Sequence, residues 1–277
     1  MDIIKAVVLG IIQGLAEFFP ISSSGHLVLA HELLGLSFNE AENLTFDVFL
    51  HLGTLIAVCI VFRKTVWGLI LAFFSSIKKI FTGKYSWKTA EKYEKMLGLL
   101  IISCLPLFVV LFVKDYIEAA FSSALLVGIM LLITAAILFI SDKLQNGKYT
   151  ARTAKPWHPL VIGAIEAVAV IPGISRSGST IFGGLVCGFD RKFATEFAFI
   201  MSIPAVLAAT LLEVKDIIEV GMDTDIIYCL VGVTVSAVVG IFAIKLVQFL
   251  ANKKQFKFFS VYCLIVGVTV IIWSLLV

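Results

Sequence analysis

Long apolar runs dominate the chain, and its polar residues gather in the stretches between them. A transmembrane helix needs about 20 mostly apolar residues to cross roughly 30 Å of hydrocarbon. Runs of this kind lie near residues 46–62, 96–113, 121–140, 194–212, 226–250 and 257–277. The pattern therefore predicts an all-α integral membrane protein with about six transmembrane helices.

The composition supports this class. Of the 277 residues, 60% are hydrophobic and 15% are charged, and the mean hydropathy is +1.05. These values exclude an ordinary soluble protein. The net charge of +3 is small and reflects the basic loops, so we expect no nucleic-acid partner. The five cysteines stand singly in apolar runs, and we expect small buried side chains there rather than disulfides or metal ligands.

Two apolar stretches differ from the others because polar residues interrupt them. Residues 13–27 (QGLAEFFPISSSGHL) align without a gap with residues 166–180 (EAVAVIPGISRSGST). The matching pairs are Gln13 with Glu166, Ser22 with Ser175, Ser24 with Ser177, and Gly25 with Gly178. Between the aligned serines, Ser23 of the first copy faces Arg176 of the second. One copy thus offers a hydroxyl and the other a fixed positive charge, which predicts two halves of one anion site.

Loop charge predicts the orientation of the spans. The segment 63–95 is strongly basic, which places it in the cytoplasm by the positive-inside rule. The loops 142–157 and 251–257 are also basic, whereas 213–225 is acidic. Successive loops alternate between the two sides of the membrane, as their charges require, only if both polar stretches leave the membrane on the side from which they entered.

We therefore expect two re-entrant helix–loop–helix hairpins, residues 3–36 entering from outside and residues 160–188 entering from the cytoplasm. They belong to two inverted-topology repeats, 1–141 and 156–277, of a single membrane domain spanning 1–277. The apolar run 65–81 is then an amphipathic helix on the cytoplasmic surface. A membrane-spanning 65–81 would contradict this topology.

The break in each hairpin is suited to binding an anion. A half-helix that begins at such a break leaves unpaired amide groups and the positive end of its dipole pointing at the gap. Residues 22–25 open one half-helix and residues 175–178 open the other, each with serines and a glycine. Arg176 adds a planar set of donors that matches phosphate oxygens. A phosphate or diphosphate is the expected ligand.

The first copy also holds groups for phosphate transfer. Glu17 lies four positions after Gln13 on the same helical face, and His26 follows the serine cluster. Ser23 would need a base to act as a nucleophile, whereas His26 could itself be the nucleophile or protonate the leaving group. The sequence leaves these alternatives open.

We expect structural roles for most other polar residues in the apolar runs. Asp47 and His51 share a helical face and are expected to be solvated or paired, and Glu196 to be structural. His31 and His158 are expected in the core or at the interface. Glu166 either satisfies amide groups of the second break or serves as a metal ligand or base.

The chain resembles the undecaprenyl-diphosphatase family, also called bacitracin-resistance proteins. The resemblance covers the whole length and depends on two elements. The first is Gln13 and Glu17 followed by PISSSGH at 20–26, and the second comprises Pro172, Gly173, Ser175, Arg176, Ser177 and Thr180. The resemblance implies a phosphatase of the bacterial plasma membrane that converts undecaprenyl diphosphate to undecaprenyl phosphate. It also implies an active site open to the outer face and support from Mg²⁺ or Ca²⁺, and a homodimer is among the assemblies it allows.

Residue by residue, the resemblance assigns catalytic roles to Glu17, Ser23, His26 and Arg176. Glu17 would be the acid/base or metal-associated carboxylate, Ser23 the nucleophile, His26 the alternative nucleophile or proton donor, and Arg176 the phosphate clamp. The substrate-binding set is Gln13, Ser22, Ser24, Gly25, Gly173, Ser175, Ser177, Gly178 and Thr180. Gln13 takes the uncharged option at the family's first acidic position, so Glu166 is the candidate second carboxylate for a metal beside Glu17.

Two rival classes fit parts of this pattern. Inverted repeats with broken helices are also typical of secondary transporters, so a lipid-phosphate flippase or anion transporter is the main alternative. A lipid phosphatase of the phosphatidic-acid type shares the Ser-Gly-His fragment. That family needs a second histidine-bearing motif, and no histidine follows His158.

Overall fold

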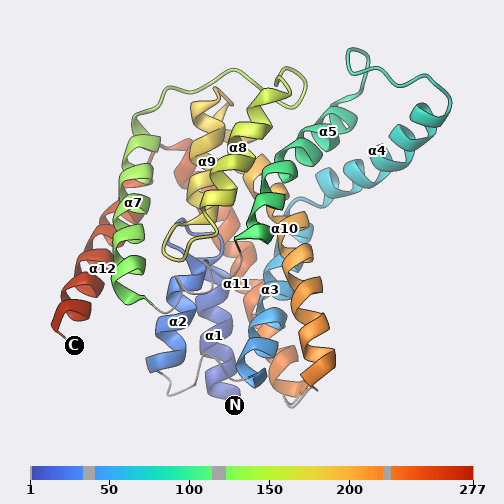
Figure 1. Ribbon diagram of the computed structural model, residues 1–277. Coiled ribbons are helices and arrows are strands. Elements are labelled where there is room, and N and C mark those ends of the chain that lie inside the picture. Colours follow the sequence, from blue (N-terminus) through green and yellow to red (C-terminus); the bar gives the residue numbers. More distant parts are fainter. Residues whose placement is uncertain (1, 34–40, 114–122, 221–225, 277) are drawn as a thin grey trace.

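The computed structural model describes residues 2–33, 41–113, 123–220 and 226–276, and its regular elements there are helices (Figure 1). They are α1 (Ile3–Ala16), α2 (Ser23–Leu33), α3 (Ala41–Val61), α4 (Arg63–Phe81), α5 (Lys92–Cys104), the 3-10 helix η1 (Leu105–Phe112), α7 (Ala124–Lys143), α8 (Trp157–Val168), α9 (Arg176–Val186), α10 (Arg191–Val220), α11 (Ile226–Asn252) and α12 (Lys257–Leu276). The all-α prediction is confirmed.

Four helical segments in the described residues are long and apolar enough to cross a membrane. They are Lys92–Val110, Ala124–Lys143, Ile226–Asn252 and Lys257–Leu276. A fifth results if Thr45–Val61 and Arg63–Phe81, which meet at 89°, are counted as one bent span. The predicted run 194–212 lies inside α10 and is outside this set. The chain is thus a multi-pass helical protein with four or five such spans, against the six expected.

The two polar stretches form short helix pairs that enter the molecule from opposite ends. α1 and α2 rise from the end that holds the N-terminus, and α8 and α9 descend from the other end (Figure 1). Their breaks, residues 17–22 and 169–175, meet near the middle of the molecule. A proline and a serine in both breaks, with Gly173 added in the second, end the first helix of each pair.

Close helix packing positions the first pair. α11 lies between α1 and α3, and a Cβ atom added at Gly14 of α1 would come within 2.8 Å of the Ser236 carbonyl oxygen. A Cβ atom at Gly53 of α3 would come within 2.6 Å of the Val233 carbonyl oxygen. Small residues thus allow the backbones to approach, as is common between helices in membranes.

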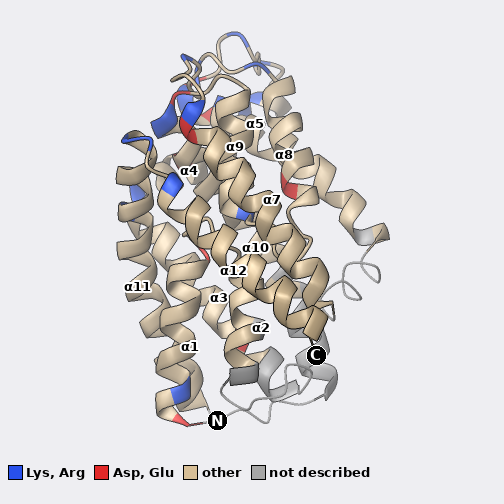
Figure 2. Cartoon of the chain, turned by 90° about the vertical axis from the view of Figure 1, so that its left-hand side faces the viewer, with Lys and Arg blue, Asp and Glu red and all other residues tan. Residues whose placement is uncertain are grey.

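The basic loops gather at one end of the molecule (Figure 2). Asp142 accepts hydrogen bonds from the backbone of Phe256 and Lys257, which joins two of these loops. The buried Arg191 donates to the carbonyl oxygens of Ser141, Leu144 and Ala251 at the ends of α7 and α11. The three loops predicted to share one side of the membrane therefore lie together.

Candidate active site

The two sequence copies contact each other directly at their breaks. The Gly173 amide donates to the Ser22 hydroxyl at 3.2 Å, and the Ser177 hydroxyl donates to the Phe19 carbonyl at 3.4 Å. Glu17 and Arg176 face each other across the same junction. The structure thus brings together the two halves that the sequence alignment paired.

The backbone reverses at a different position in each copy. Gly173 has φ +93° in the second break, whereas Ser22 has φ +73° in the first. Such an angle is uncommon for a residue with a side chain, and it stores strain that surrounding contacts must hold. The Ser22 carbonyl accepts the His26 amide and the His26 Nδ1, and its hydroxyl accepts the Gly173 amide. Contacts from both sides therefore hold the strained turn.

α7 fixes the second break through a residue that the sequence motifs did not include. The Thr134 hydroxyl donates to the Gly173 carbonyl at 2.9 Å and accepts the Ser175 amide at 3.0 Å. A Cβ atom at Gly173 would come within 2.5 Å of the Val127 carbonyl oxygen. Only glycine therefore fits this approach of the break to α7.

Both α2 and α9 begin where the breaks meet, and neither has an acidic residue in its first turn. The Ser175 hydroxyl caps α9 by accepting the Gly178 amide at 3.1 Å. Arg176 then places a positive charge at the positive end of the α9 dipole. Two helix N-termini and a guanidinium create a positive potential that favours an anion.

Glu17 is the centre of the polar network. Its side chain is only 6% exposed, and its Oε2 accepts the Ser23 hydroxyl at 2.8 Å and the Gln13 amide at 3.2 Å. Its Oε1 lies 3.8 Å from Nη1 of Arg176. The carboxylate therefore touches a hydroxyl from its own copy and a guanidinium from the other.

His51 joins this network, although we expected a structural role for it. Its Nε2 lies 3.8 Å from Oε2 of Glu17, and its Nδ1 contacts the Asp47 carbonyl at 2.8 Å. Asp47 itself pairs with the buried His31 at 3.1 Å, which agrees with the paired role expected for it. The signal for His51 in the sequence is a titratable residue within an apolar run.

His26 pairs with Tyr262 rather than with the Glu17 carboxylate. Its Nδ1 contacts the Ser22 carbonyl at 2.8 Å, and its Nε2 contacts the Tyr262 hydroxyl at 2.7 Å. The two rings are stacked with centroids 5.6 Å apart. The candidate groups thus divide into a Glu17–Ser23 pair and a His26–Tyr262 pair on either side of Ser22.

The remaining predicted site residues have varied surroundings. Ser24 contacts the Ser22 hydroxyl at 3.3 Å, and the Thr180 hydroxyl donates to the Arg176 carbonyl at 2.8 Å. A Cβ atom at Gly25 would meet nothing closer than 3.6 Å, so steric fit does not require glycine there. At Gly178 it would come within 3.0 Å of Pro20, so this glycine lets the copies pack.

Glu166 is 1% exposed and lies on α8, and its Oε2 has no hydrogen-bond partner among the described residues. Three or more His, Cys, Asp or Glu side chains that could hold a metal do not converge anywhere in the described part of the chain. Mg²⁺ needs fewer, because it is commonly held by one or two carboxylates, substrate phosphates and water. A single carboxylate such as Glu17 is enough for a site of that kind, in which phosphate oxygens and water would supply the other ligands.

The space at the centre of the site is small. Glu17, Arg176, Thr180 and the α10 residues Phe199 and Ser202 enclose a cavity of about 10 Å³. This volume is about that of one water molecule. A phosphate group does not fit in this cavity while its lining side chains keep these positions.

A polar centre of this kind, enclosed by apolar helices, places the protein in the class of multi-pass membrane proteins with a buried polar centre. Comparison with known proteins narrows the class. The chain belongs to the family described as bacitracin resistance protein BacA, whose family model matches residues 6–269.

Relatives match over the full length. The chain is 39% identical over 278 residues to an undecaprenyl-diphosphatase of Alkaliphilus metalliredigens, with 100% of both chains covered. It is 38% identical to one of Methanosphaera stadtmanae, covering 99% of both chains, and 39% identical to one of Halothermothrix orenii, covering 98% of both. The family suggested by the sequence motifs is thereby confirmed.

Proposed function

We propose that the protein hydrolyses undecaprenyl diphosphate to undecaprenyl phosphate and inorganic phosphate, which recycles the lipid carrier of cell-wall synthesis and confers bacitracin resistance. The names of its full-length relatives support this activity. The observation that carries the chemistry is the 2.8 Å hydrogen bond from the Ser23 hydroxyl to Glu17, beside Arg176. A hydroxyl next to a carboxylate base and a phosphate-binding cation suits phosphoryl transfer.

In the proposed first step, Oγ of Ser23 attacks the terminal phosphorus while Glu17 accepts the hydroxyl proton. The new bond joins Oγ to phosphorus, and the bond from phosphorus to the bridging oxygen breaks. Undecaprenyl phosphate leaves with the electron pair of that bond. Arg176 and the amides at the starts of α2 and α9 spread the charge of the transition state.

The second step releases phosphate. Glu17 first gives up the Ser23 proton to the departing undecaprenyl phosphate. Water then attacks the phosphoserine, and Glu17 accepts a proton from the water and passes it to Oγ as the bond from phosphorus to Oγ breaks, which restores the Ser23 hydroxyl. His26 supplies or accepts protons on the leaving-group side, held in position by Tyr262. Ser23 is thus favoured over His26 as nucleophile, because Ser23 already contacts a base.

Glu17 and the substrate phosphates would hold a divalent cation, Mg²⁺ or Ca²⁺, on the terminal phosphate. Such a cation neutralises phosphate charge when bound. The two oxygens of Glu17 have different partners. Oε2 accepts the Ser23 hydroxyl and the Gln13 amide, and Oε1 faces Arg176.

We also propose that the chain has six spans and two re-entrant hairpins in inverted repeats, with the site open to the outer face of the plasma membrane. The opposite entry of the two helix pairs supports the inversion. The shared end of the basic loops supports a cytoplasmic side. The 89° bend before α4, and Trp67 that is 63% exposed, support a surface helix rather than a span.

A flippase or anion transporter moves its substrate unchanged, and the names of the relatives do not favour it. Phosphate release from undecaprenyl diphosphate by the purified chain in detergent separates the two classes, because no gradient exists there. We expect release that falls with a chelator. Arg176→Ala and Glu17→Ala should abolish it while elution and melting temperature stay unchanged, with Lys253→Ala as the control. Near-normal release by either site variant would refute the proposed function.

A further inference from the structure

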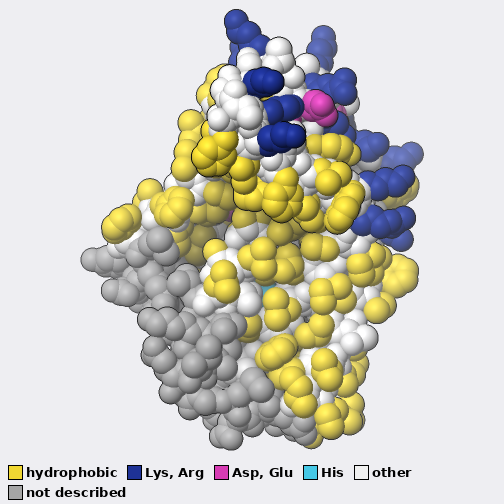
Figure 3. Space-filling view, turned by 90° about the vertical axis from the view of Figure 1, so that its right-hand side faces the viewer, with side chains coloured by type: hydrophobic (Ala, Val, Ile, Leu, Met, Phe, Trp, Pro, Cys, Tyr) yellow, Lys and Arg dark blue, Asp and Glu magenta, His cyan; other side chains and the backbone are white. Residues whose placement is uncertain are grey.

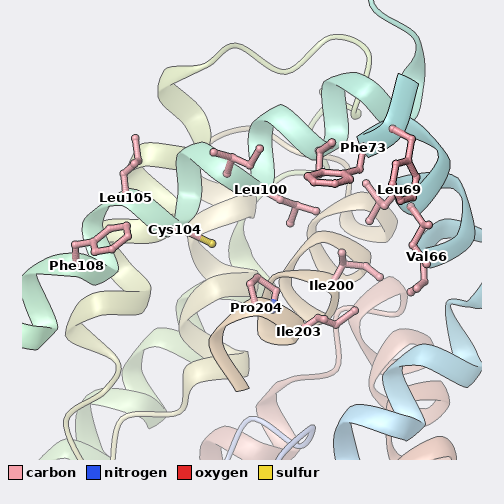
Figure 4. A pocket seen from close by; sticks show the side chains of 14 residues that line it. Val66, Leu69, Phe73, Leu100, Cys104, Leu105, Phe108, Ile200, Ile203 and Pro204 are labelled. Carbon is pink, nitrogen blue, oxygen red and sulfur yellow. The ribbon is translucent and has the colours of Figure 1, made fainter. Parts of the chain in front are cut away.

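Two neighbouring cavities adjoin α5 and α10, away from the candidate active site. One is an apolar groove of about 620 Å³, lined by side chains such as Phe73, Leu100, Phe108, Ile203 and Pro204 (Figure 4). The other is a polar cavity of about 240 Å³ at the basic end of the molecule. Neither holds a residue of the proposed phosphatase mechanism.

Three basic side chains line the polar cavity, namely Lys92, Arg152 and Lys192. All three residues are exposed, and no ion pair joins them to a carboxylate within the described ranges. Lys95 adds a fourth positive charge nearby, since its Nζ donates to the Arg152 carbonyl at 3.3 Å. A cluster with an excess of positive charge attracts anions.

Two carboxylates also line the polar cavity, but each has another partner. Asp190 accepts the Phe193 amide at 2.9 Å as α10 begins. Glu196 accepts the Thr65 hydroxyl at 2.6 Å, which ties α10 to the start of α4. The cavity keeps an excess of positive charge.

The two cavities follow each other along the same helices. α5 contributes Lys92 to the polar cavity and Leu100 to the groove, and α10 contributes Phe193 and Ile200 in the same way. Figure 3 shows Lys and Arg side chains gathered at one end of this side of the molecule, with a largely hydrophobic surface below them. A charged head and an apolar tail are therefore accommodated about two helical turns apart.

We propose that this pair of cavities binds an anionic phospholipid, with its phosphate against Lys92, Arg152 and Lys192 and one acyl chain in the groove. Basic pockets between helices at the cytoplasmic surface are suited to anionic headgroups. The groove of about 620 Å³ is apolar and suits an acyl chain.

The position of α10 also separates this occupant from the enzyme substrate. Phe199 and Ser202 face the cavity beside Glu17, whereas Ile200 and Ile203 line the groove on another face of the helix. A lipid in the groove therefore contacts the helix that closes the candidate active site without reaching Glu17.

Native mass spectrometry of the full chain in detergent tests the headgroup, with phosphatidylglycerol and phosphatidylcholine of identical acyl chains as probes. We expect phosphatidylglycerol to bind at least about tenfold more tightly, and the triple variant K92Q/R152Q/K192Q to bring the two within about twofold. The control K253Q/K254Q/K257Q removes the same charge from the same end outside the cavity and should keep the preference. If the triple variant fails to fold, Arg152→Gln alone should still reduce the preference, by about fivefold.

Equal binding of both lipids, or an equal loss in the control variant, would overturn the proposal. Displacement of phosphatidylglycerol by inorganic phosphate would show that the site binds anions but not acyl chains. Tighter binding of undecaprenyl phosphate at these residues would show that the occupant is a different lipid.

The groove is tested separately. Ile203→Trp fills the groove and should weaken phosphatidylglycerol binding about tenfold, whereas Leu207→Trp, on the same helix outside the groove, should not. If Ile203→Trp leaves phosphatidylglycerol binding unchanged, the groove is not where the acyl chain binds.

Discussion

The first and second broken helix pairs share one sequence frame but supply different chemistry. The first pair carries Glu17 and Ser23, joined by a hydrogen bond. The second carries Arg176 at the position of Ser23 and Val170 at the position of Glu17. A few substitutions on one repeated scaffold thus separate the proposed proton-transfer groups, Glu17 and Ser23, from the proposed anion-binding group, Arg176.

The turns differ as well. The second pair reverses at Gly173, where a positive φ involves little strain because glycine has no side chain. The first reverses at Ser22, where a positive φ strains the backbone. The strained turn lies in the copy that carries the proposed nucleophile. Strain at a reactive centre is a common way to hold a side chain in a fixed direction, here Ser23 toward Glu17.

The largest effect should come from the central residue of the first copy. Ser23→Ala removes the proposed nucleophile and should lower phosphate release by about 10⁴-fold or more. A phosphate-release assay with a labelled terminal phosphate, followed by acid quench, should find label on the wild-type chain and none on the variant. Ser274→Ala, near the end of α12 and outside the site, is the matched control, and label carried by His26 would contradict the assignment.

The central residue of the second copy should come next. Arg176→Lys keeps the charge but loses the planar donor pair, and we expect phosphate release about a thousandfold slower. The swap S23R/R176S should also be inactive, because Val170 cannot act as a base for the relocated serine. Activity of the swapped chain would mean that the two copies are interchangeable.

The turn of the second copy should be sensitive to a single methyl group. Gly173→Ala combines a positive φ with a clash against the Val127 carbonyl, at 2.5 Å from the added Cβ. We expect a loss of about 2–4 kcal/mol of stability, seen as a lower melting temperature in detergent. Gly25→Ala, where the added Cβ meets only ordinary contacts at 3.6 Å, should melt close to the wild type.

The smallest effect should come from the partner of His26. Tyr262→Phe removes the 2.7 Å contact with Nε2 and keeps the ring stacked. We expect phosphate release about tenfold slower and an altered dependence of the rate on pH, because His26 loses a fixed partner. A purely structural role for Tyr262 would leave the pH profile unchanged.

Local sequence features predicted much of the fold. Apolar runs predicted the long helices, and the observed α4, Arg63–Phe81, nearly coincides with the predicted surface helix 65–81. Proline, glycine and serine in both polar stretches predicted the two breaks. The run 96–113 was predicted as one helix, but Pro106 lacks an amide donor, and the chain continues as a 3-10 helix from Leu105.

The candidate site could be predicted only where its residues are close in sequence. Glu17 and Ser23 belong to one motif, and the alignment of the copies added Arg176. Tyr262 is 236 residues from His26 and lies in an ordinary apolar span, so no local pattern pairs them. Thr134 was missed for the same reason, because its contacts with Gly173 and Ser175 depend on how α7 packs.

The contact between the two breaks also bears on how such a protein could have arisen. Because the helix pairs enter from opposite ends, one repeat alone holds half of the polar centre. An ancestor encoding a single repeat would have completed that centre only by meeting a second copy inserted in the opposite orientation. After fusion of two such copies into one chain, each copy would have had a single fixed orientation. Different residues, Ser23 and Arg176, would then have been possible at the same aligned position.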